Sequence, residues 1–253
     1  MGFFRGLGKL TGSIAFTTFL VLAILLIEMV DFTSYDNFKP LAGDIFEGRL
    51  FSAVSDSDLD DLRNFLLFQC SGRDMVSVPL LGGQPVVLNC NDVRNSDKTQ
   101  LKSLITTAVV DTAYYKDFSC SFIDCVMKGD PENLSVVVSS EGNEFYKSLQ
   151  TYAWMGTVLG LALLVLSTET WDGRLKGAGF NLVFVGLPFL FVGYFQSSLT
   201  SLIPPELEAA ANPIIESLMS SLKDKFMIVL GIGVASVAAG YALGFYLSRK
   251  KKK

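Results

Sequence analysis

The sequence contains no histidine among its 253 residues. Histidine is the commonest general base near neutral pH and the commonest protein ligand for transition metals, so its absence argues against a serine or cysteine triad and against a zinc hydrolase. The four cysteines form no Cys-x-x-Cys pair, which also disfavours a zinc site. We therefore expect no catalytic residues of these types, no metal and no cofactor. Carboxylate chemistry stays open.

Charged residues are nearly absent from four long apolar segments. Apolar residues make up 50% of the chain and the mean hydropathy is +0.40. Each segment is close to the roughly 20 residues that cross a hydrocarbon core of about 30 Å, and backbone amides in lipid have to be paired within a helix. The sequence therefore predicts an α-helical membrane protein with four transmembrane helices, at residues 11–30, 150–168, 178–195 and 226–247.

A secretory signal peptide is the alternative interpretation of residues 11–30. Their apolar stretch is longer than the roughly 7–15 residues usual for a signal peptide. No small-x-small cleavage site follows, because the chain continues from Glu28 to Asp31. These features favour an uncleaved membrane anchor.

Basic residues predict the orientation of the four helices. Three short segments, residues 1–10, 169–177 and 248–253, are rich in lysine and arginine, whereas residues 31–149 carry more acidic than basic residues. Short cytoplasmic segments are enriched in basic residues, so we expect a multi-pass protein of the cell membrane with both termini in the cytoplasm. The basic residues are Arg5, Lys9, Arg174, Lys176, Arg249 and Lys250 to Lys253.

The basic C-terminus has two interpretations. It is typical of a stop-transfer cluster that also attracts anionic lipid. Lys250 and Lys251 also stand at the positions of a dilysine retrieval signal, which would operate only in a cell with an endoplasmic reticulum. The first interpretation is favoured.

Residues 31–149 are expected to form a small α+β extracytoplasmic domain between helices 1 and 2. All four cysteines lie there, which indicates disulfides rather than a metal site. Nearness in the sequence favours the pairs Cys70–Cys90 and Cys120–Cys125. Ser55 is expected to cap a first helix, and Asn95 to Asp97 to cap a second at 98–118. Residues 75–80 and 85–89 are expected to form a hairpin and 134–139 a further strand, and Asn133 begins a glycosylation sequon.

Acidic residues of this domain are the remaining candidates for chemistry. The run Asp56, Asp58, Asp60 and Asp61 lacks the glycine and glutamate of a calcium loop, so a helix-cap role is favoured. Asp111, Asp117 and Asp124 could supply paired carboxylates for work on a glycan. Their spacing does not require it, and a solvated face is the simpler interpretation.

Ionisable residues are also scarce within the apolar segments. Glu28 is the exception, and its place near the outer end of its helix predicts that it reaches water. The scarcity argues against a proton relay or an ion-coupled transporter. Small residues instead suggest close helix packing, within the chain or with a partner helix. They are Gly156 and Gly160 in the second helix and Ser236, Gly240 and Gly244 in the fourth.

Residues 196–225 are expected to form an outer, amphipathic loop. Pro213 suits the first turn of a helix that could lie on the membrane, pack under the domain, or continue into the fourth transmembrane helix, because residues 223–225 contain no helix breaker. Its apolar side would serve as an interaction face. The residues of that side are Ile214, Ile215, Leu218, Met219 and Leu222.

Three functions are compatible with these features. The favoured one is a non-catalytic accessory or scaffold protein that lies in the lipid bilayer and binds a membrane or envelope protein partner through its outer domain. We expect no binding of nucleic acid. An oligomer is compatible with the glycine stripes. The order of helices and outer segments is similar to that of FtsX and MacB-type permease subunits, which implies a coupling subunit working with a cytoplasmic ATPase. The third is an outer-face enzyme that uses carboxylates.

Overall fold

The computed structural model describes residues 2–51, 54–79, 85–129, 135–191 and 205–250. They form two compact units: unit 1 contains residues 1–30 and 146–253, and unit 2 contains residues 31–145. The described helices include four that are long and apolar enough to cross a membrane, as the sequence predicted, which indicates a multi-pass membrane protein. These candidate spans are Arg5–Thr33, Ser140–Leu166, Trp171–Phe191 and Ile215–Lys250.

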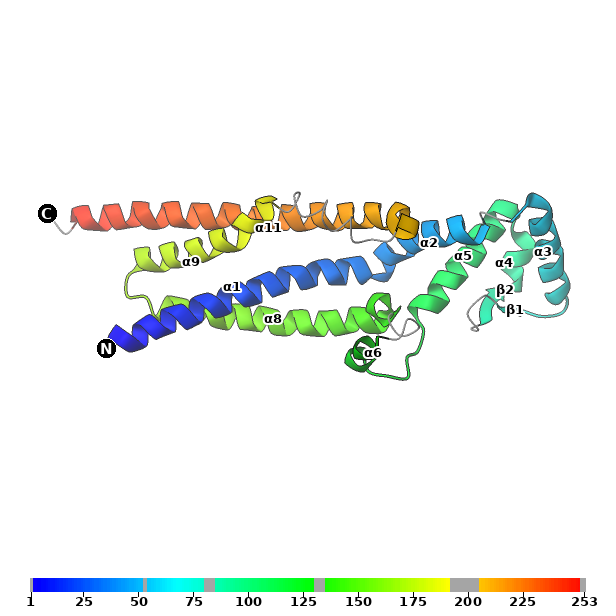
Figure 1. Ribbon diagram of the computed structural model, residues 1–253, viewed down its shortest axis with the longest axis horizontal. Helices are drawn as coiled ribbons and strands as arrows, with labels where there is room; N and C mark the ends of the chain where they lie inside the picture. Colours follow the sequence, from blue (N-terminus) through cyan, green and yellow to red (C-terminus); the bar gives the residue numbers. More distant parts are fainter. Residues whose placement is uncertain (1, 52–53, 80–84, 130–134, 192–204, 251–253) are drawn as a thin grey trace. The chain divides into compact units, whose positions relative to one another are not determined.

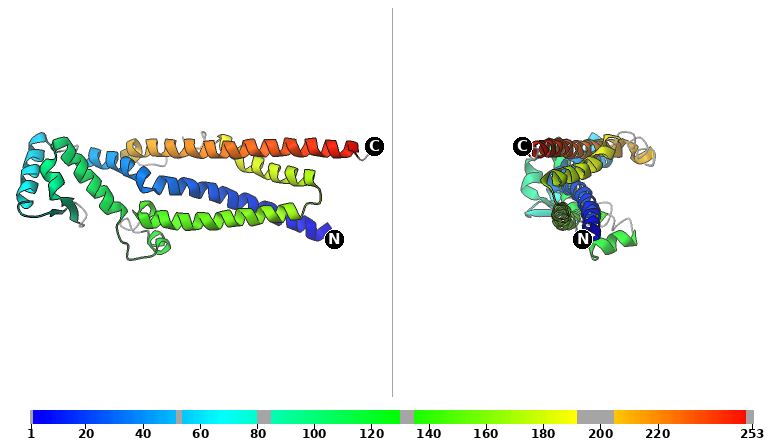
Figure 2. Two further views of the ribbon diagram at one scale, coloured as in Figure 1. Left: turned by 180° about the vertical axis from the view of Figure 1, so that it is seen from behind. Right: turned by 90° about the vertical axis from the view of Figure 1, so that its left-hand side faces the viewer.

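The helices of unit 1 are longer than their apolar segments. They are α1 (Gly2–Thr33), α8 (Ser140–Leu166), α9 (Trp171–Gly186), its 3-10 continuation η2 (Leu187–Phe191), and α11 (Pro205–Lys250). Within the unit, α1 lies beside α8 and α9 lies beside α11 (Figures 1 and 2).

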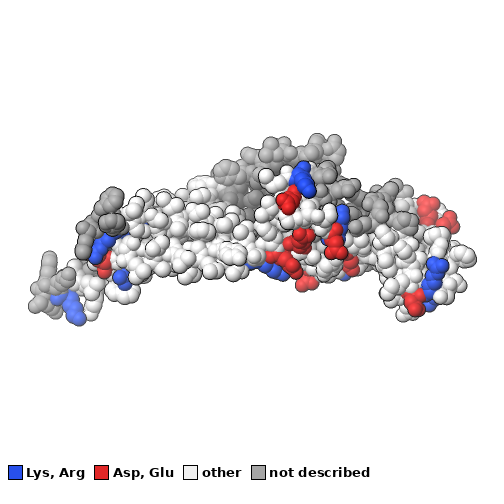
Figure 3. Space-filling model, turned by 90° about the horizontal axis from the view of Figure 1, so that it is seen from below, with Lys and Arg blue, Asp and Glu red and all other residues white. Residues whose placement is uncertain are grey.

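Charged side chains bound an apolar stretch on these helices. At 1.5 Å per residue, the stretch from Lys9 to Glu28 is about 28 Å long and that from Lys225 to Arg249 about 36 Å, close to the thickness of a hydrocarbon core. The same helices appear largely white on the face drawn in Figure 3, where Lys, Arg, Asp and Glu are coloured. The charge pattern therefore fits a bilayer around unit 1.

Two helix ends differ from the sequence prediction. Helix α9 begins at Trp171, where the Thr170 side chain accepts a hydrogen bond from the Gly173 backbone N–H, so much of the expected turn at 169–177 is helical. Helix α11 begins at Pro205 and not at Pro213, and its backbone continues without a break into the fourth span. The expected loop at 196–225 is thus helical from residue 205 onward, and the side chains of α11 are described from Ile215.

Unit 2 combines six helical segments of α or 3-10 type and a hairpin within the described residues. They are α2 (Tyr35–Phe51), α3 (Asp56–Gln69), β1 (Met75–Pro79), β2 (Pro85–Asn89), α4 (Cys90–Asn95), α5 (Lys98–Tyr114), α6 (Phe122–Lys128) and the 3-10 helix η1 (Ser135–Val138). The strands pair antiparallel, so the predicted hairpin is confirmed; Leu80 to Gln84 lie outside the described residues.

Local signals explain most of these elements. Ser55 and Asp58 form a reciprocal capping box at the start of α3, and Asp97 and Gln100 do so at the start of α5. The strand expected at 134–139 is wrong, because this valine-rich segment forms η1 and runs into α8 instead of pairing with a strand among the described residues. Asn133 lies outside the described residues.

The core of unit 2 lies between the hairpin and helices α3, α4 and α5. Val76, Val86 and Leu88 pack there against Leu66 and Leu101. Phe65, also on α3, does not belong to this core: its side chain is 53% exposed. Leu59 and Leu66 are fully buried seven residues apart, and Phe65 is turned about 100° away from that stripe on the helix.

Both ends of unit 2 meet at Thr33. The Thr33 side chain is fully buried; its hydroxyl accepts a hydrogen bond from the Asn143 amide (2.9 Å), and its carbonyl accepts one from the Tyr114 hydroxyl (2.9 Å). These bonds join the entry of the chain into unit 2 to its exit, and join both to the end of α5.

Candidate functional site

The four cysteines of unit 2 form two disulfides, Cys70–Cys90 and Cys120–Cys125. This is the pairing expected from their spacing. Cys70 and Cys90 are fully buried in the core beside the hairpin. Cys120 and Cys125 close a short loop that leads into α6.

Loss of the two disulfides is expected to destabilise unit 2 unequally. A disulfide limits the unfolded chain more when it closes a longer loop, and the separations are 20 and 5 residues. We expect Cys70→Ser with Cys90→Ser to lower the free energy of unfolding by about 3 kcal/mol, and Cys120→Ser with Cys125→Ser by about 2 kcal/mol. Thermal unfolding of the two double variants in one detergent measures the order. A larger loss from the second pair would contradict it.

A groove beside the hairpin is a candidate binding site in unit 2. It has a volume of ≈ 470 Å³ and lies between β2 and α5, with α4 at one end. We call it the β2–α5 groove. Its lining combines apolar, polar and acidic side chains, among them Val87, Leu88, Asp92, Ser103, Leu104, Ala108 and Asp111.

The backbone of β2 borders this groove with its free edge. Cys90, directly after β2, donates its N–H to the Asp74 carbonyl (2.9 Å), so Cys90 and Asp74 form a hydrogen-bonded pair. In the same register Val87 stands opposite Ser77, three positions further along the ladder. In an antiparallel ladder, hydrogen-bonded and non-hydrogen-bonded pairs alternate, so Val87 and Ser77 form a non-hydrogen-bonded pair. The N–H and C=O of Val87 therefore point away from β1. The sheet has two strands in the described part of the chain, which leaves this edge open.

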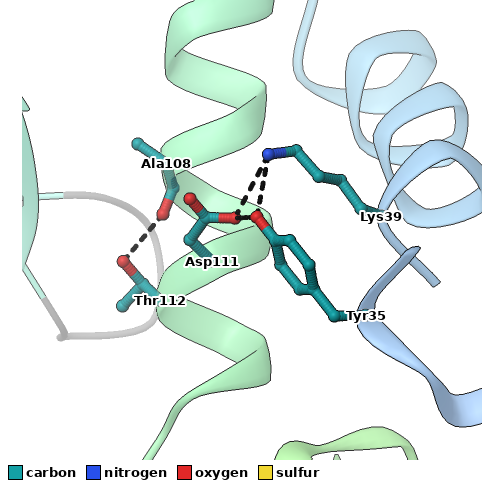
Figure 4. A network of polar contacts seen from close by, with 5 residues as sticks. All are labelled: Tyr35, Lys39, Ala108, Asp111 and Thr112. Atoms are coloured by element: carbon teal, nitrogen blue, oxygen red, sulfur yellow. Dashed lines mark hydrogen bonds and ion pairs between the residues drawn. The ribbon is translucent and has the colours of Figure 1, made fainter. Parts of the chain in front are cut away.

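A polar network fixes one acidic residue of the groove (Figure 4). Tyr35 on α2 donates its hydroxyl hydrogen to the carboxylate of Asp111 on α5. Lys39, one turn further along α2, donates to the Tyr35 oxygen at 2.8 Å and lies 3.8 Å from the Asp111 carboxylate. The network joins α2 to α5 and partly neutralises Asp111. Asp92, at the other end of the groove, is exposed and forms no ion pair with another described residue.

The hydrogen bond between Tyr35 and Asp111 predicts that the stability of unit 2 falls at alkaline pH. The bond to Asp111 raises the pKa of the Tyr35 hydroxyl above its ordinary value of 10.0, because only the neutral hydroxyl can donate it. Because the pKa of Tyr35 is higher in the folded state than in the unfolded state, its hydrogen bond stabilises the fold fully at pH values below the unfolded pKa. This stabilisation is lost as the pH rises through the folded pKa.

Tyr35→Phe is therefore expected to reduce the pH sensitivity of unfolding. At about pH 8 the variant should be about 1 kcal/mol less stable than the wild type, because the hydrogen bond is missing and the site is half-exposed. Above about pH 10 this difference should shrink, since the wild type then loses the same bond. Burial also raises the pKa of Tyr114, but this residue is common to both proteins. A constant difference across the titration would contradict the assignment.

Three of the other acidic candidates form contacts that support the fold. Asp58 accepts from the Ser55 hydroxyl, Asp60 pairs with Lys98 at 2.7 Å, and Asp124 accepts from the Ser121 hydroxyl. Among the described residues, no group of three or more histidine, cysteine, aspartate or glutamate side chains could hold a metal ion.

Glu28 in unit 1 is buried and paired, so the expectation that it reaches water is wrong. Its side chain is 6% exposed, lies 2.6 Å from the Lys225 ammonium and accepts from the Ser221 hydroxyl at 3.1 Å. Both partners belong to the part of α11 that precedes the predicted fourth span. Because α11 begins before that span, it covers the end of α1, which the apolar pattern alone did not reveal.

The predicted glycine stripes lie at helix contacts inside unit 1. A Cβ atom on Gly160 would lie 2.5 Å from the Phe16 backbone nitrogen, and one on Gly240 would lie 2.8 Å from Cγ of Lys176. Gly156 faces the Phe19 ring, Gly244 faces Asp172, and Ser236 is half-buried. These small residues therefore allow α1 to approach α8 and α9 to approach α11.

The predicted amphipathic face also lies partly inside unit 1. Ile215, Leu218, Met219 and Leu222 are half-buried, and Leu222 packs against the cluster around Phe226. The side chain of Ile214 lies outside the described residues. The described part of this face is therefore partly occupied within the chain.

The chain matches no protein-family model, no curated protein and no solved structure. Function therefore has to be inferred from the residues of the β2–α5 groove and from the membrane helices.

Proposed function

We propose that this protein is a non-catalytic accessory or scaffold subunit of the cell membrane, and that unit 2 lies outside the cytoplasm and binds a partner protein in the β2–α5 groove. The groove itself carries the proposal, because it joins an open strand edge to apolar and acidic side chains. Concave sites with a few placed polar groups are the usual form of binding sites.

Two observations support an outer position for unit 2. Disulfides persist mainly in oxidising, non-cytoplasmic compartments, and both cysteine pairs of unit 2 are bonded. Unit 2 follows the C-terminal end of α1, whereas Arg5 and Lys9 stand at the N-terminal end of that helix. Arg249 stands at the C-terminal end of α11. This distribution follows the preference of basic residues for the cytoplasmic side.

Site-specific photocrosslinking tests the proposed function. A photoreactive residue in place of Ser103, which lines the groove, is expected to give a discrete adduct with one other protein in native membranes. The same residue in place of Asn64, exposed on α3 and outside the groove, is the matched control and should give none. Mass spectrometry of the purified adduct identifies its components. No adduct from position 103, or equal adducts from both positions, would overturn the proposal.

A coupling subunit is the second candidate, and the continuity of α11 favours it. This helix runs without interruption from Pro205 to Lys250, about 69 Å at 1.5 Å per residue, and could transmit a movement across a bilayer. The cytoplasmic link between α8 and α9 is short, however, with Leu166 and Trp171 as the flanking helix ends. A cytoplasmic ATPase that copurifies in mild detergent would favour this candidate over the first.

A further inference from the structure

The chemistry of the occupant follows from the groove, and this step rests on the proposed function. We propose that the β2–α5 groove binds an extended peptide segment carrying a lysine or arginine, which pairs with β2 as a third strand. Strand addition to an exposed sheet edge is a recurring mode of peptide recognition, in which backbone bonds supply affinity and side-chain pockets supply specificity.

The open edge of β2 defines the length of the added strand. Backbone groups point away from β1 at Pro85, Val87 and Asn89, which alternate with the residues bonded to β1. Pro85 has no N–H to donate, and Asn89 is the N-cap of α4. The edge therefore offers one complete pair of groups at Val87, flanked by the Pro85 carbonyl and the Asn89 N–H. These groups suit a short segment and not a long strand.

The groove walls define the side chains of that segment. Leu104 and Ala108 on α5 supply apolar surface opposite β2, while Asp92 and Asp111 supply negative charge. Among the described residues that line the groove, none is lysine or arginine, and Lys39 lies 3.8 Å from the Asp111 carboxylate at one end. Since alternate residues of a strand point to opposite sides, a segment of alternating basic and apolar residues would separate the two kinds, with basic residues for Asp92 on α4 and apolar residues for Leu104 and Ala108 on α5.

The outer edge of β1 provides an internal control. Ser77 stands opposite Val87 in the register, so its N–H also points away from the hairpin. Ser77 does not line the groove. Proline at either position removes an outward N–H without removing a bond between β1 and β2. Ser77→Pro and Val87→Pro are therefore matched substitutions, and of these two positions Val87 is the one that lines the groove.

Binding to the full-length chain in lipid nanodiscs tests the inference. The probe is a fluorescent hexapeptide of alternating lysine and valine. Two further probes are the same peptide with alternate backbone amides N-methylated, and a peptide of alternating glutamate and valine. We expect the lysine–valine probe to bind the wild type and Ser77→Pro with equal affinity. It should bind Val87→Pro at least about tenfold more weakly, and Asp92→Asn about threefold more weakly. Asp61→Asn, on α3, should bind like the wild type.

Several outcomes would overturn the inference. They are no binding of the lysine–valine probe, equal binding of the N-methylated probe, equal binding of the glutamate–valine probe, or equal loss in Val87→Pro and Ser77→Pro. The probe comparisons use the wild type, so they hold even if a proline variant does not fold. The photocrosslinking adduct from position 103 separates the two proposals: if it forms while these tests fail, the groove binds a partner in another way; if it does not form, the proposed function itself fails.

Discussion

Replacing Glu28 with alanine is expected to lower the free energy of unfolding of the detergent-solubilised protein by about 3 kcal/mol. The substitution leaves the Lys225 ammonium, whose side chain is only 30% exposed, without its carboxylate partner at 2.6 Å. It also removes the acceptor of the Ser221 hydroxyl. Removing one member of a buried pair costs more than the pair contributes, because the other charge stays desolvated. Thermal or denaturant unfolding of unit 1 measures the effect.

Two further variants separate the pair from a general effect of charge. The exchange of Glu28→Lys with Lys225→Glu should recover a large part of the stability, because the opposite charges are restored in the same place. Lys223→Met, on the exposed side of the same helix, should change stability by less than about 0.5 kcal/mol. Equal losses in Glu28→Ala and Lys223→Met, or no recovery in the exchange, would show that the ion pair is not formed.

Gly160→Leu is expected to prevent the close contact of α1 with α8. A Cβ atom at this position would lie 2.5 Å from the backbone nitrogen of Phe16 and 2.8 Å from its Cα. A backbone cannot move aside as a flexible side chain can, so the helices would have to separate. Overpacking usually costs 1–3 kcal/mol, and we expect a loss of about 3 kcal/mol or more here. The measurement is the unfolding midpoint, with the monodisperse fraction in size-exclusion chromatography as a second readout.

Gly231→Leu is the matched control for this substitution. Gly231 lies in the middle of α11, and no atom of the part of the chain that the structure describes comes within 4 Å of a Cβ atom placed there. The same glycine-to-leucine change should therefore alter stability by less than about 0.5 kcal/mol. If both variants lose equal stability, the loss is caused by the glycine-to-leucine change within a helix and not by disruption of the α1–α8 contact.

Local and periodic signals in the sequence were sufficient for much of the fold. Four apolar segments predicted the four candidate spans, Ser55 and Asp97 marked two helix starts, and nearness in the chain indicated both disulfides. Each of these features depends on residues close together in the sequence. Helix α2 had no such signal, because Pro40 lies inside it and its apolar residues show no clear helical period.

Contacts between residues far apart in the chain could not be predicted from such local signals. Glu28 and Lys225 are far apart in the chain, and the place of Glu28 near the outer end of its helix predicted a solvated glutamate and not a paired one. The groove needs the free edge of β2, Asp92 on α4 and Asp111 on α5 together, and the sequence spacing of the aspartates shows none of this. Asp111 was considered as a carboxylate, but its bond to Tyr35 depends on how α2 packs against α5.

Labelling of introduced cysteines in intact cells tests the central claim, that unit 2 and its groove lie on the outer side of a membrane crossed four times. Ser103→Cys places a thiol in the groove and Lys250→Cys places one at the end of α11. A membrane-impermeant maleimide is predicted to label the first variant in intact cells and the second only after lysis. Labelling of the Lys250→Cys variant in intact cells, with protection of the Ser103→Cys variant until lysis, would contradict the account.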